Sequence, residues 1–198
     1  MEPVLRSAIA LLLGLGLFVG GCDRQEPAAG QAGNAAAPAP PLPPQAEAPV
    51  PAGQIDRSHK GEAAPDFAFA DPLGKTTTLA AYRGTPVLMN LWATWCAPCV
   101  KEMPTLEALA AREGSGLKVL TISQDLDGPA KVVPYFNRAG FTRLEPWSDP
   151  ELRFSVGLGA NLPTTVLYDA EGKEVWRVTG ALDWAGEEAA RLLGEATG

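Results

Sequence analysis

The sequence predicts an α/β domain with a mixed sheet flanked by helices on both faces. Residues 86–92 (PVLMNLW) form a continuous apolar run of strand length, as expected for a strand that is covered on both sides. Residues 96–113 then carry apolar side chains at helical spacing. A later pair of strand-like segments flanks a turn at 169–173. Together these segments predict a sheet with parallel and antiparallel neighbours.

The other elements follow from local signals. Phe67 and Phe69 alternate before a turn at 71–74, and threonines follow, which predicts an N-terminal β-hairpin. Asp149–Pro150 predicts an N-cap followed by proline in the first helical position, with a short helix through Val156. The remaining elements expected are strands at 118–123, 164–168 and 174–179 and helices at 129–139 and 184–193.

Composition limits the chemistry of the chain. Its 198 residues carry a net charge of −7, and 46% of them are hydrophobic, which suits one ordinary globular domain. The acidic balance argues against nucleic acid as a partner, because phosphates require clustered cations. With one histidine and three cysteines, a four-ligand zinc site, a cysteine-rich iron–sulfur cluster and a core Ser–His triad all lack parts. We therefore expect no metal and no cofactor.

Residues 1–21 are predicted to be a targeting segment. Arg6 precedes an apolar run, 8–19, and small residues then lead to Cys22. This run is short for a membrane span. The segment resembles a bacterial lipoprotein signal, which would make Cys22 the lipidated residue. The alternative is an uncleaved membrane anchor, and both interpretations place the rest of the chain outside the cytoplasm.

Residues 22–58 are expected to form a flexible tether, and residues 59–198 the folded domain. The stretch 23–55 is dominated by alanine, proline and glycine and has no aromatic residue. Proline at this density favours extended, solvated conformations that bury nothing. Its expected function is to hold the domain away from a membrane surface.

The chemistry is concentrated in Trp95-Cys96-Ala97-Pro98-Cys99, which follows an apolar strand and opens a helix. Two cysteines separated by two residues at a helix start can close a small disulfide ring. The positive end of the helix stabilises the first thiolate, so Cys96 is the expected nucleophile. Cys99 lies about one turn further along and is the expected resolving thiol.

Other uses of this motif are less suitable. Zinc would need a second Cys/His pair, and haem attachment would need histidine where Val100 stands. A purely structural disulfide would gain little from so short a loop.

Glu102 is a candidate for proton transfer. On a helical wheel it lies about 60° from Cys99, between the directions of Leu106 and Leu109. Apolar neighbours predict partial burial, which would raise the pKa of the carboxyl group and let it exchange protons with the cysteines. The alternative is a glutamate that only favours the helix dipole.

Three segments of the chain carry a resemblance to a known family. They are Val87–Pro104, Leu162-Pro163-Thr164-Thr165 and Gly180-Ala181-Leu182-Asp183-Trp184-Ala185. They resemble the thioredoxin-like proteins of the TlpA group, which include the ResA and CcmG types. The resemblance implies a thioredoxin fold with an N-terminal β-hairpin extension and a central insertion, and thiol–disulfide exchange outside the cytoplasm.

The resemblance also implies roles for single residues. Leu162, Pro163 and Thr164 match the loop that faces the disulfide, with a cis bond before Pro163 and the Leu162 backbone free to pair with a client. Asn90 stands where cytoplasmic thioredoxins have a proton-handling aspartate, which leaves Glu102 as the substitute. Trp95 is expected to line the client surface. Ala97-Pro98 resembles the dipeptides of reducing thioredoxins.

The sequence therefore predicts a membrane-tethered thiol–disulfide oxidoreductase that reduces client proteins through the Cys96–Cys99 pair. It is expected on the periplasmic face of the inner membrane, anchored by lipid or helix, with a membrane thiol reductase to re-reduce it. The resemblance implies assembly factors of the cytochrome oxidase copper centre as clients. The alternatives are a cytochrome c maturation reductant of the CcmG type and a non-catalytic copper chaperone of the Sco type. The latter uses a wider cysteine spacing and a distant histidine.

Overall fold

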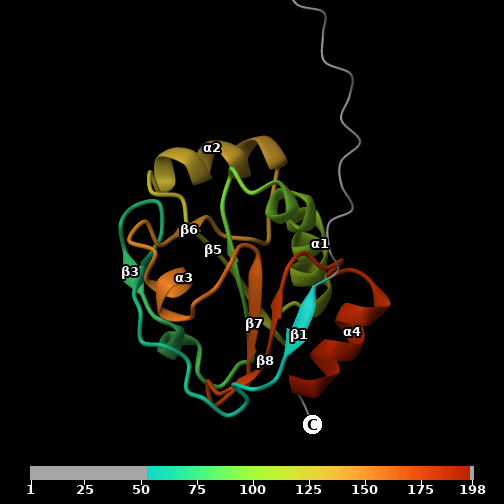
Figure 1. Cartoon of the computed structure of the whole chain (residues 1–198). Helices are drawn as coiled ribbons and strands as arrows, with labels where there is room; N and C mark the ends of the chain where they lie inside the picture. The colour runs from blue at the N-terminus through green and yellow to red at the C-terminus, as the bar shows by residue number, and fades with distance from the viewer. Residues whose placement is uncertain (1–52, 197–198) are drawn as a thin grey trace, which may run out of the picture. The chain divides into compact units, whose positions relative to one another are not determined.

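The computed structural model describes residues 53–196, and the predictions for the targeting segment, Cys22 and most of the tether lie outside them. Within the described part, eight strands form one mixed sheet in the order β1-β8-β7-β4-β5-β6-β2-β3 (Figure 1). The strands are β1 (Gln54–Asp56), β2 (Phe69–Ala70), β3 (Thr76–Thr77), β4 (Val87–Trp92), β5 (Lys118–Ser123), β6 (Trp147–Ser148), β7 (Thr164–Tyr168) and β8 (Glu174–Thr179).

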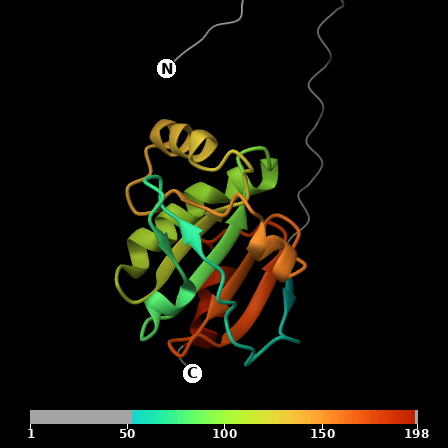
Figure 2. The ribbon, with the colours of Figure 1, turned by 90° about the vertical axis from the view of Figure 1, so that its left-hand side faces the viewer.

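Helices lie on both faces of this sheet, as the sequence predicts. They are α1 (Ala97–Glu113), α2 (Pro129–Ala139), α3 (Arg153–Gly157) and α4 (Glu187–Leu193), with the 3-10 turns η1 (Leu79–Tyr82) and η2 (Gly194–Ala196). Side chains of α1, α2 and α4 join one core cluster, and those of β2, η1 and α3 join another. Figures 1 and 2 show α3 and the β2–β3 hairpin on the side of the sheet away from α1 and α4.

The central strand β4 explains how the two cores are separated. All six of its residues are buried, and it pairs in parallel with β5 and antiparallel with β7. Because side chains alternate along a strand, Leu88 and Trp92 enter the core under α1, whereas Met89 and Leu91 enter the other. Asn90 has the same parity as Leu88 and Trp92. The sequence therefore directs this amide towards α1.

Most expected elements are confirmed. The hairpin lies at β2–β3, and α2 and β6 lie between β5 and α3.

Two helix starts are wrong. The helix α3 begins at Arg153, after Leu152 in a left-handed conformation with φ 58°, so Pro150 is not its first residue. Asp149 still caps it through space, because its Oδ2 accepts a hydrogen bond from the N–H of Phe154 at 2.9 Å. The last helix begins at Glu187 and leaves Trp184 in the preceding loop.

Strand β1 lies within the segment that the sequence predicted as tether. It pairs antiparallel with β8, from Gln54 opposite Thr179 to Asp56 opposite Arg177. The preceding Gly53 donates its N–H to the carbonyl of Ala181 at 3.1 Å. The sheet therefore begins before the predicted boundary at residue 59. Between residues 53 and 196, no helix has the length and apolar character that crossing a bilayer requires.

Candidate functional site

The two cysteines of the motif are joined at the start of α1. Cys96 and Cys99 form a disulfide with their Cα atoms 5.3 Å apart. Cys96 is the N-cap residue of α1, and its carbonyl accepts the hydrogen bond from the N–H of Val100 at 3.0 Å. Cys96 keeps 6% of its surface exposed, whereas Cys99 is fully buried. This arrangement agrees with an accessible first thiol at the positive helix end and a shielded second one.

Glu102 is buried one turn beyond Cys99, as the helical wheel predicts. Only 3% of its surface is exposed. Its Oε1 accepts a hydrogen bond from Asn90 Nδ2 at 2.7 Å, and its Oε2 accepts from Leu182 N and Trp184 Nε1, both at 3.2 Å. Burial raises the pKa of Glu102 to about 7, against the opposing effect of these hydrogen bonds. A carboxyl group with this pKa can both take up and release a proton near neutral pH.

Asn90 connects Glu102 to the neighbouring strand. Its Nδ2 also donates to Thr165 Oγ1 at 2.9 Å, across the β4–β7 pair. Its Oδ1 is buried without a hydrogen-bond partner among the described residues. An amide has no charge of its own, so the only ionisable group of this buried network is the carboxyl group of Glu102.

The contact from Trp184 was not predicted. The pattern of residues 184–193 predicts a helix that starts at Trp184, and Trp184 also belongs to the segment 180–185 that carries the family resemblance. Trp184 is fully buried and stacks on Trp176 with ring centroids 6.3 Å apart. A buried indole N–H needs an acceptor, and this requirement was the signal that could have pointed to Glu102.

The loop before β7 has the predicted cis bond between Leu162 and Pro163. The carbonyl of Pro163 accepts a hydrogen bond from Gly180 N at 2.9 Å, and Leu162 packs at the edge of both cores. Thr164 is buried, and its hydroxyl donates to the carbonyl of Asn161 at 2.6 Å. That hydroxyl is therefore used within the loop.

The residues around the disulfide differ in exposure. Trp95 is 69% exposed, Ala97 is exposed and Pro98 is half-buried. An exposed tryptophan beside Cys96 agrees with the predicted client surface. Cys22 lies outside the described residues.

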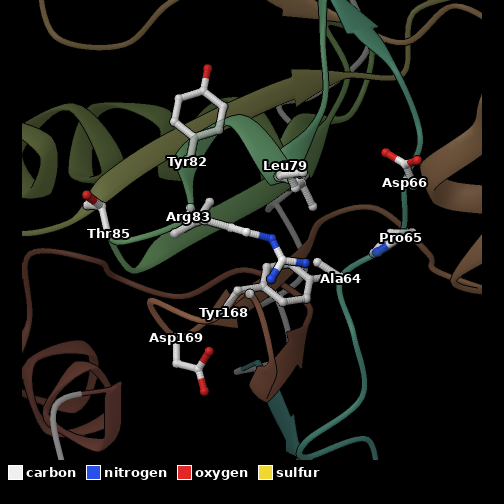
Figure 3. A pocket seen from close by; sticks show the side chains of 12 residues that line it. Ala64, Pro65, Asp66, Leu79, Tyr82, Arg83, Thr85, Tyr168 and Asp169 are labelled. Atoms are coloured by element: carbon white, nitrogen blue, oxygen red, sulfur yellow. The ribbon is translucent and has the colours of Figure 1, made fainter.

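A separate cavity of about 250 Å³ lies at the opposite edge of the sheet (Figure 3). It is lined by the start of β4 and the end of β7, with Tyr82, Arg83 and Tyr168 among its residues. The cysteines follow the other end of β4, so this cavity is not part of the candidate site.

The fold and the disulfide at a helix start define the class of protein. The chain is a thiol–disulfide oxidoreductase with a thioredoxin-like fold, and its catalytic reaction is disulfide exchange with client proteins. Residues 59–193 match the model of the Redoxin family, and the chain belongs to that family.

Relatives agree with this class. The chain is 33% identical over 124 residues to the thiol-disulfide oxidoreductase ResA of Geobacillus thermodenitrificans, covering 62% of this chain and 70% of the relative. It resembles a structure from Chlorobium tepidum assigned as a thiol:disulfide interchange protein DsbE, with 28% identity, a TM-score of 0.60, and coverage of 70% of this chain and 98% of that one. It also resembles the exposed lipoprotein thioredoxin Etrx1 of Streptococcus pneumoniae, with 25% identity, a TM-score of 0.55, and coverage of 67% and 99%.

Proposed function

We propose that this protein works as a reductant of client disulfides outside the cytoplasm, tethered to the membrane by its N-terminal region. The observation that carries the proposal is the buried Glu102, whose pKa of about 7 suits proton exchange with the cysteine pair one helical turn away. The identity to ResA and the likeness to the exposed lipoprotein thioredoxin support the reaction and the setting.

The reaction proceeds in two exchanges. The Cys96 thiolate attacks one sulfur of the client disulfide, forming a mixed disulfide and releasing the first client thiolate. Cys99 then gives its proton to the Glu102 carboxylate, and its thiolate attacks the sulfur of Cys96. The Cys96–Cys99 disulfide forms, and the second client thiolate leaves and is protonated. Two electrons pass from the cysteine pair to the client, and a membrane thiol reductase returns them.

The proposed clients are assembly factors of the cytochrome oxidase copper centre, on the strength of the TlpA resemblance of residues 87–104. In the same proposal the anchor is the lipidated Cys22 or an uncleaved helix within residues 1–21. Leu162 and Pro163 would hold the client as an extended segment beside Trp95.

Trapping of clients on a Cys99→Ser variant tests this function. The variant should accumulate mixed disulfides through Cys96, because the residue that resolves them is gone.

In the reduced native protein, Cys96 should alkylate at least about tenfold faster than Cys99 at pH 7, since it is the more accessible thiol at the helix start. Mass spectrometry of the alkylated peptides measures this ratio. A faster reaction at Cys99 would reverse the assignment of the two thiols.

Deletion of residues 31–49 tests the tether. These residues are rich in alanine and proline and should bury nothing, so the thermal midpoint of the purified domain should stay within about 2 °C of the native value. Client reduction in cells should fall, because the domain would no longer reach its partners. A midpoint lower by several degrees would mean that the segment packs on the domain.

A further inference from the structure

Trp184 reaches Glu102 from the loop that connects β8 to α4, and it is fully buried there. Its indole Nε1 donates to Glu102 Oε2 at 3.2 Å, and the N–H of Leu182 donates to the same oxygen. Both donors that residues 53–196 offer to this oxygen therefore come from one loop.

A second contact ties the same loop to the backbone beside Glu102. The N–H of Trp184 donates to Thr105 Oγ1 at 3.1 Å, and the hydroxyl of Thr105 donates to the carbonyl of Glu102 at 2.8 Å. Trp184 is thus bonded to one turn of α1 through both its main chain and its side chain. Supporting hydrogen bonds of this kind hold a functional group in a defined geometry.

The sheet restrains Trp184 from the other side. Its ring stacks on that of Trp176 in β8, with the ring planes 12° apart and the centroids 6.3 Å apart. At the start of the loop, the N–H of Gly180 donates to the carbonyl of Pro163 at 2.9 Å. The position of the indole is therefore set by α1, by β8 and by the loop before β7.

Trp176 shows what a tryptophan with a structural role does in this core. It is also fully buried, and its Nε1 donates to the backbone carbonyl of Leu192 at 3.1 Å. That carbonyl does not ionise, so the bond only satisfies a buried donor. The indole N–H of Trp184 binds an ionisable carboxyl group instead. Because an N–H donor stabilises the charged form of a carboxylate, this bond acts on the proton affinity of Glu102.

Burial and hydrogen bonding oppose each other at Glu102. Burial raises its pKa, and the bonds from Asn90 and from the loop lower it, with a resulting pKa of about 7. The neighbours on β4 and β7, Asn90 and Thr165, do not ionise, and the nearby charged residues Lys101 and Asp183 are exposed. A buried carboxyl group without these donors would stay protonated at neutral pH and could not accept a further proton.

We propose that Trp184 is a positioning residue for the resolving step, because it holds the carboxylate of Glu102 available as the acceptor of the Cys99 proton. This inference rests on the proposed reductase function and assigns it a residue that acts through Glu102. In that step, Cys99 gives its proton to Glu102 and its sulfur forms the bond to Cys96. The bond between Cys96 and the client sulfur breaks, and the client thiolate leaves with the electron pair of that bond. Trp184 takes no part in the bonds that change.

The test follows the resolving step alone. The reduced full chain is mixed with one equivalent of the aromatic disulfide dithiobis(nitrobenzoate), and all samples carry Cys22→Ser so that only the two thiols of the motif react. Cys96 forms the mixed disulfide and releases one coloured thionitrobenzoate, and attack by Cys99 releases the second. Since thionitrobenzoate leaves as an anion, the proton of Cys99 is the only one transferred in the second phase. Stopped-flow absorbance gives the rate of this phase from about pH 5 to about pH 9.

Trp184→Phe removes the indole N–H and keeps an aromatic ring, so it tests the bond to Glu102. The midpoint of its pH–rate profile should rise by about one pH unit, as expected for the loss of a hydrogen bond to a charged group. The ionised fraction of Glu102 at pH 7 would fall from about a half to about a tenth, so the second phase should be about fivefold slower there. The deficit should shrink as the pH rises.

Trp176→Phe is the matched control, since it removes the same group from the other ring of the stack, and it should keep the native midpoint. Thr105→Val keeps the shape of its side chain but cannot accept from Trp184, and its midpoint should move in the same direction as that of Trp184→Phe. Equal midpoints in Trp184→Phe and Trp176→Phe would overturn the role of Trp184. If Trp184→Phe does not fold, a native midpoint in Thr105→Val would overturn it instead.

Glu102→Gln separates the inference from the function on which it rests. It should remove the midpoint near pH 7, and Trp184→Phe should cause no further change in that background. A further upward shift in the double variant would mean that Trp184 does not act through Glu102. A native protein that releases only the first thionitrobenzoate would refute the reductase function itself.

Discussion

Replacement of Arg177 by methionine should lower the free energy of unfolding by about 3 to 5 kcal/mol at pH 7, because it leaves a buried carboxylate without its partner. Arg177 binds Glu174 through two hydrogen bonds, Nε to Oε1 and Nη2 to Oε2, both 2.7 Å. The side chains are 10% and 3% exposed. These bonds to Glu174 raise the pKa of Arg177, so its charge is secure.

This ion pair also reaches the loop that leads to the candidate site. Arg177 Nη1 donates to the carbonyl of Leu158 at 3.4 Å, four residues before Leu162. Loss of the guanidinium therefore removes a support of that loop as well as a charge. We expect slower client reduction in addition to the loss of stability.

Urea unfolding of the oxidised protein measures the first effect. The control is the double variant Glu174→Gln/Arg177→Met, which has lost both the carboxylate and the guanidinium group. It should recover most of the stability, because the main cost in the single variant is the unpaired carboxylate. If the double variant were as unstable as the single one, the loss would come from packing around residue 177.

The elements that could be predicted from sequence are those whose signal is local. The apolar run 86–92 and the helical stripe of 96–113 are long enough for their periodicity to identify β4 and α1. Strands β1 and β6 contain three and two residues and have no period of their own. They are strands because β8 and β5 offer hydrogen bonds to them, and this information lies in other parts of the chain.

The candidate site follows the same rule. The positions of Cys96 and Cys99 at a helix start and the burial of Glu102 were readable, since all depend on spacing within one helix. The partners of Glu102 were not, because Trp184 lies 82 residues away in the chain. The hydrogen bonds that the buried Asp125 accepts from Thr94 were missed for a similar reason. Its bond to Thr94 spans 31 residues and depends on two strands lying side by side.

In the oxidised protein, Glu102→Gln should gain stability relative to the native protein as the pH rises from 5 to 8. Burial raises the pKa of Glu102 from 4.5 to about 7, so between these values the folded state binds more protons than the unfolded state. The native protein therefore loses stability as pH rises through this range. Glutamine has no proton to lose. The stability difference in favour of the variant should grow by about 2 to 3 kcal/mol between pH 5 and pH 8.

The amide should fit the site because it resembles the protonated carboxyl group. Its oxygen can accept from Leu182 and Trp184, as Oε2 of Glu102 does now. Its NH₂ group can donate to Asn90 Oδ1, which has no hydrogen-bond partner among residues 53–196, once the Asn90 amide turns over. Asn90 can thus bind either protonation state of Glu102 without adding a second ionisable group to the site.

Glu107→Gln is the matched control on the same helix. Partial burial would raise the pKa of Glu107, but hydrogen bonds from the backbone N–H groups of Thr142, Leu144 and Arg143 together lower it below its ordinary value. A lowered pKa means that the carboxylate stabilises the fold above the unfolded pKa and loses this effect in acid. Glu107→Gln should therefore be less stable than the native protein at pH 8, and the deficit should shrink towards pH 4. As the pH rises from acid to pH 8, Glu102→Gln should gain stability relative to the native protein, whereas Glu107→Gln should lose stability relative to it.

The thiol titration of the reduced protein tests whether the buried carboxyl group of Glu102, which lowers stability near neutral pH, takes part in the reaction of the cysteines. A carboxylate that lowers stability near neutral pH is expected where its proton is used. In Glu102→Gln, a thiolate should form at lower pH, because the neighbouring negative charge is gone, while resolution of the mixed disulfide should slow without a proton acceptor for Cys99. Thiol absorbance against pH measures the first effect, and release of a trapped client measures the second. Titration curves that coincide for the native and variant proteins would leave Glu102 without a role in proton transfer, and water would then have to accept the proton of Cys99.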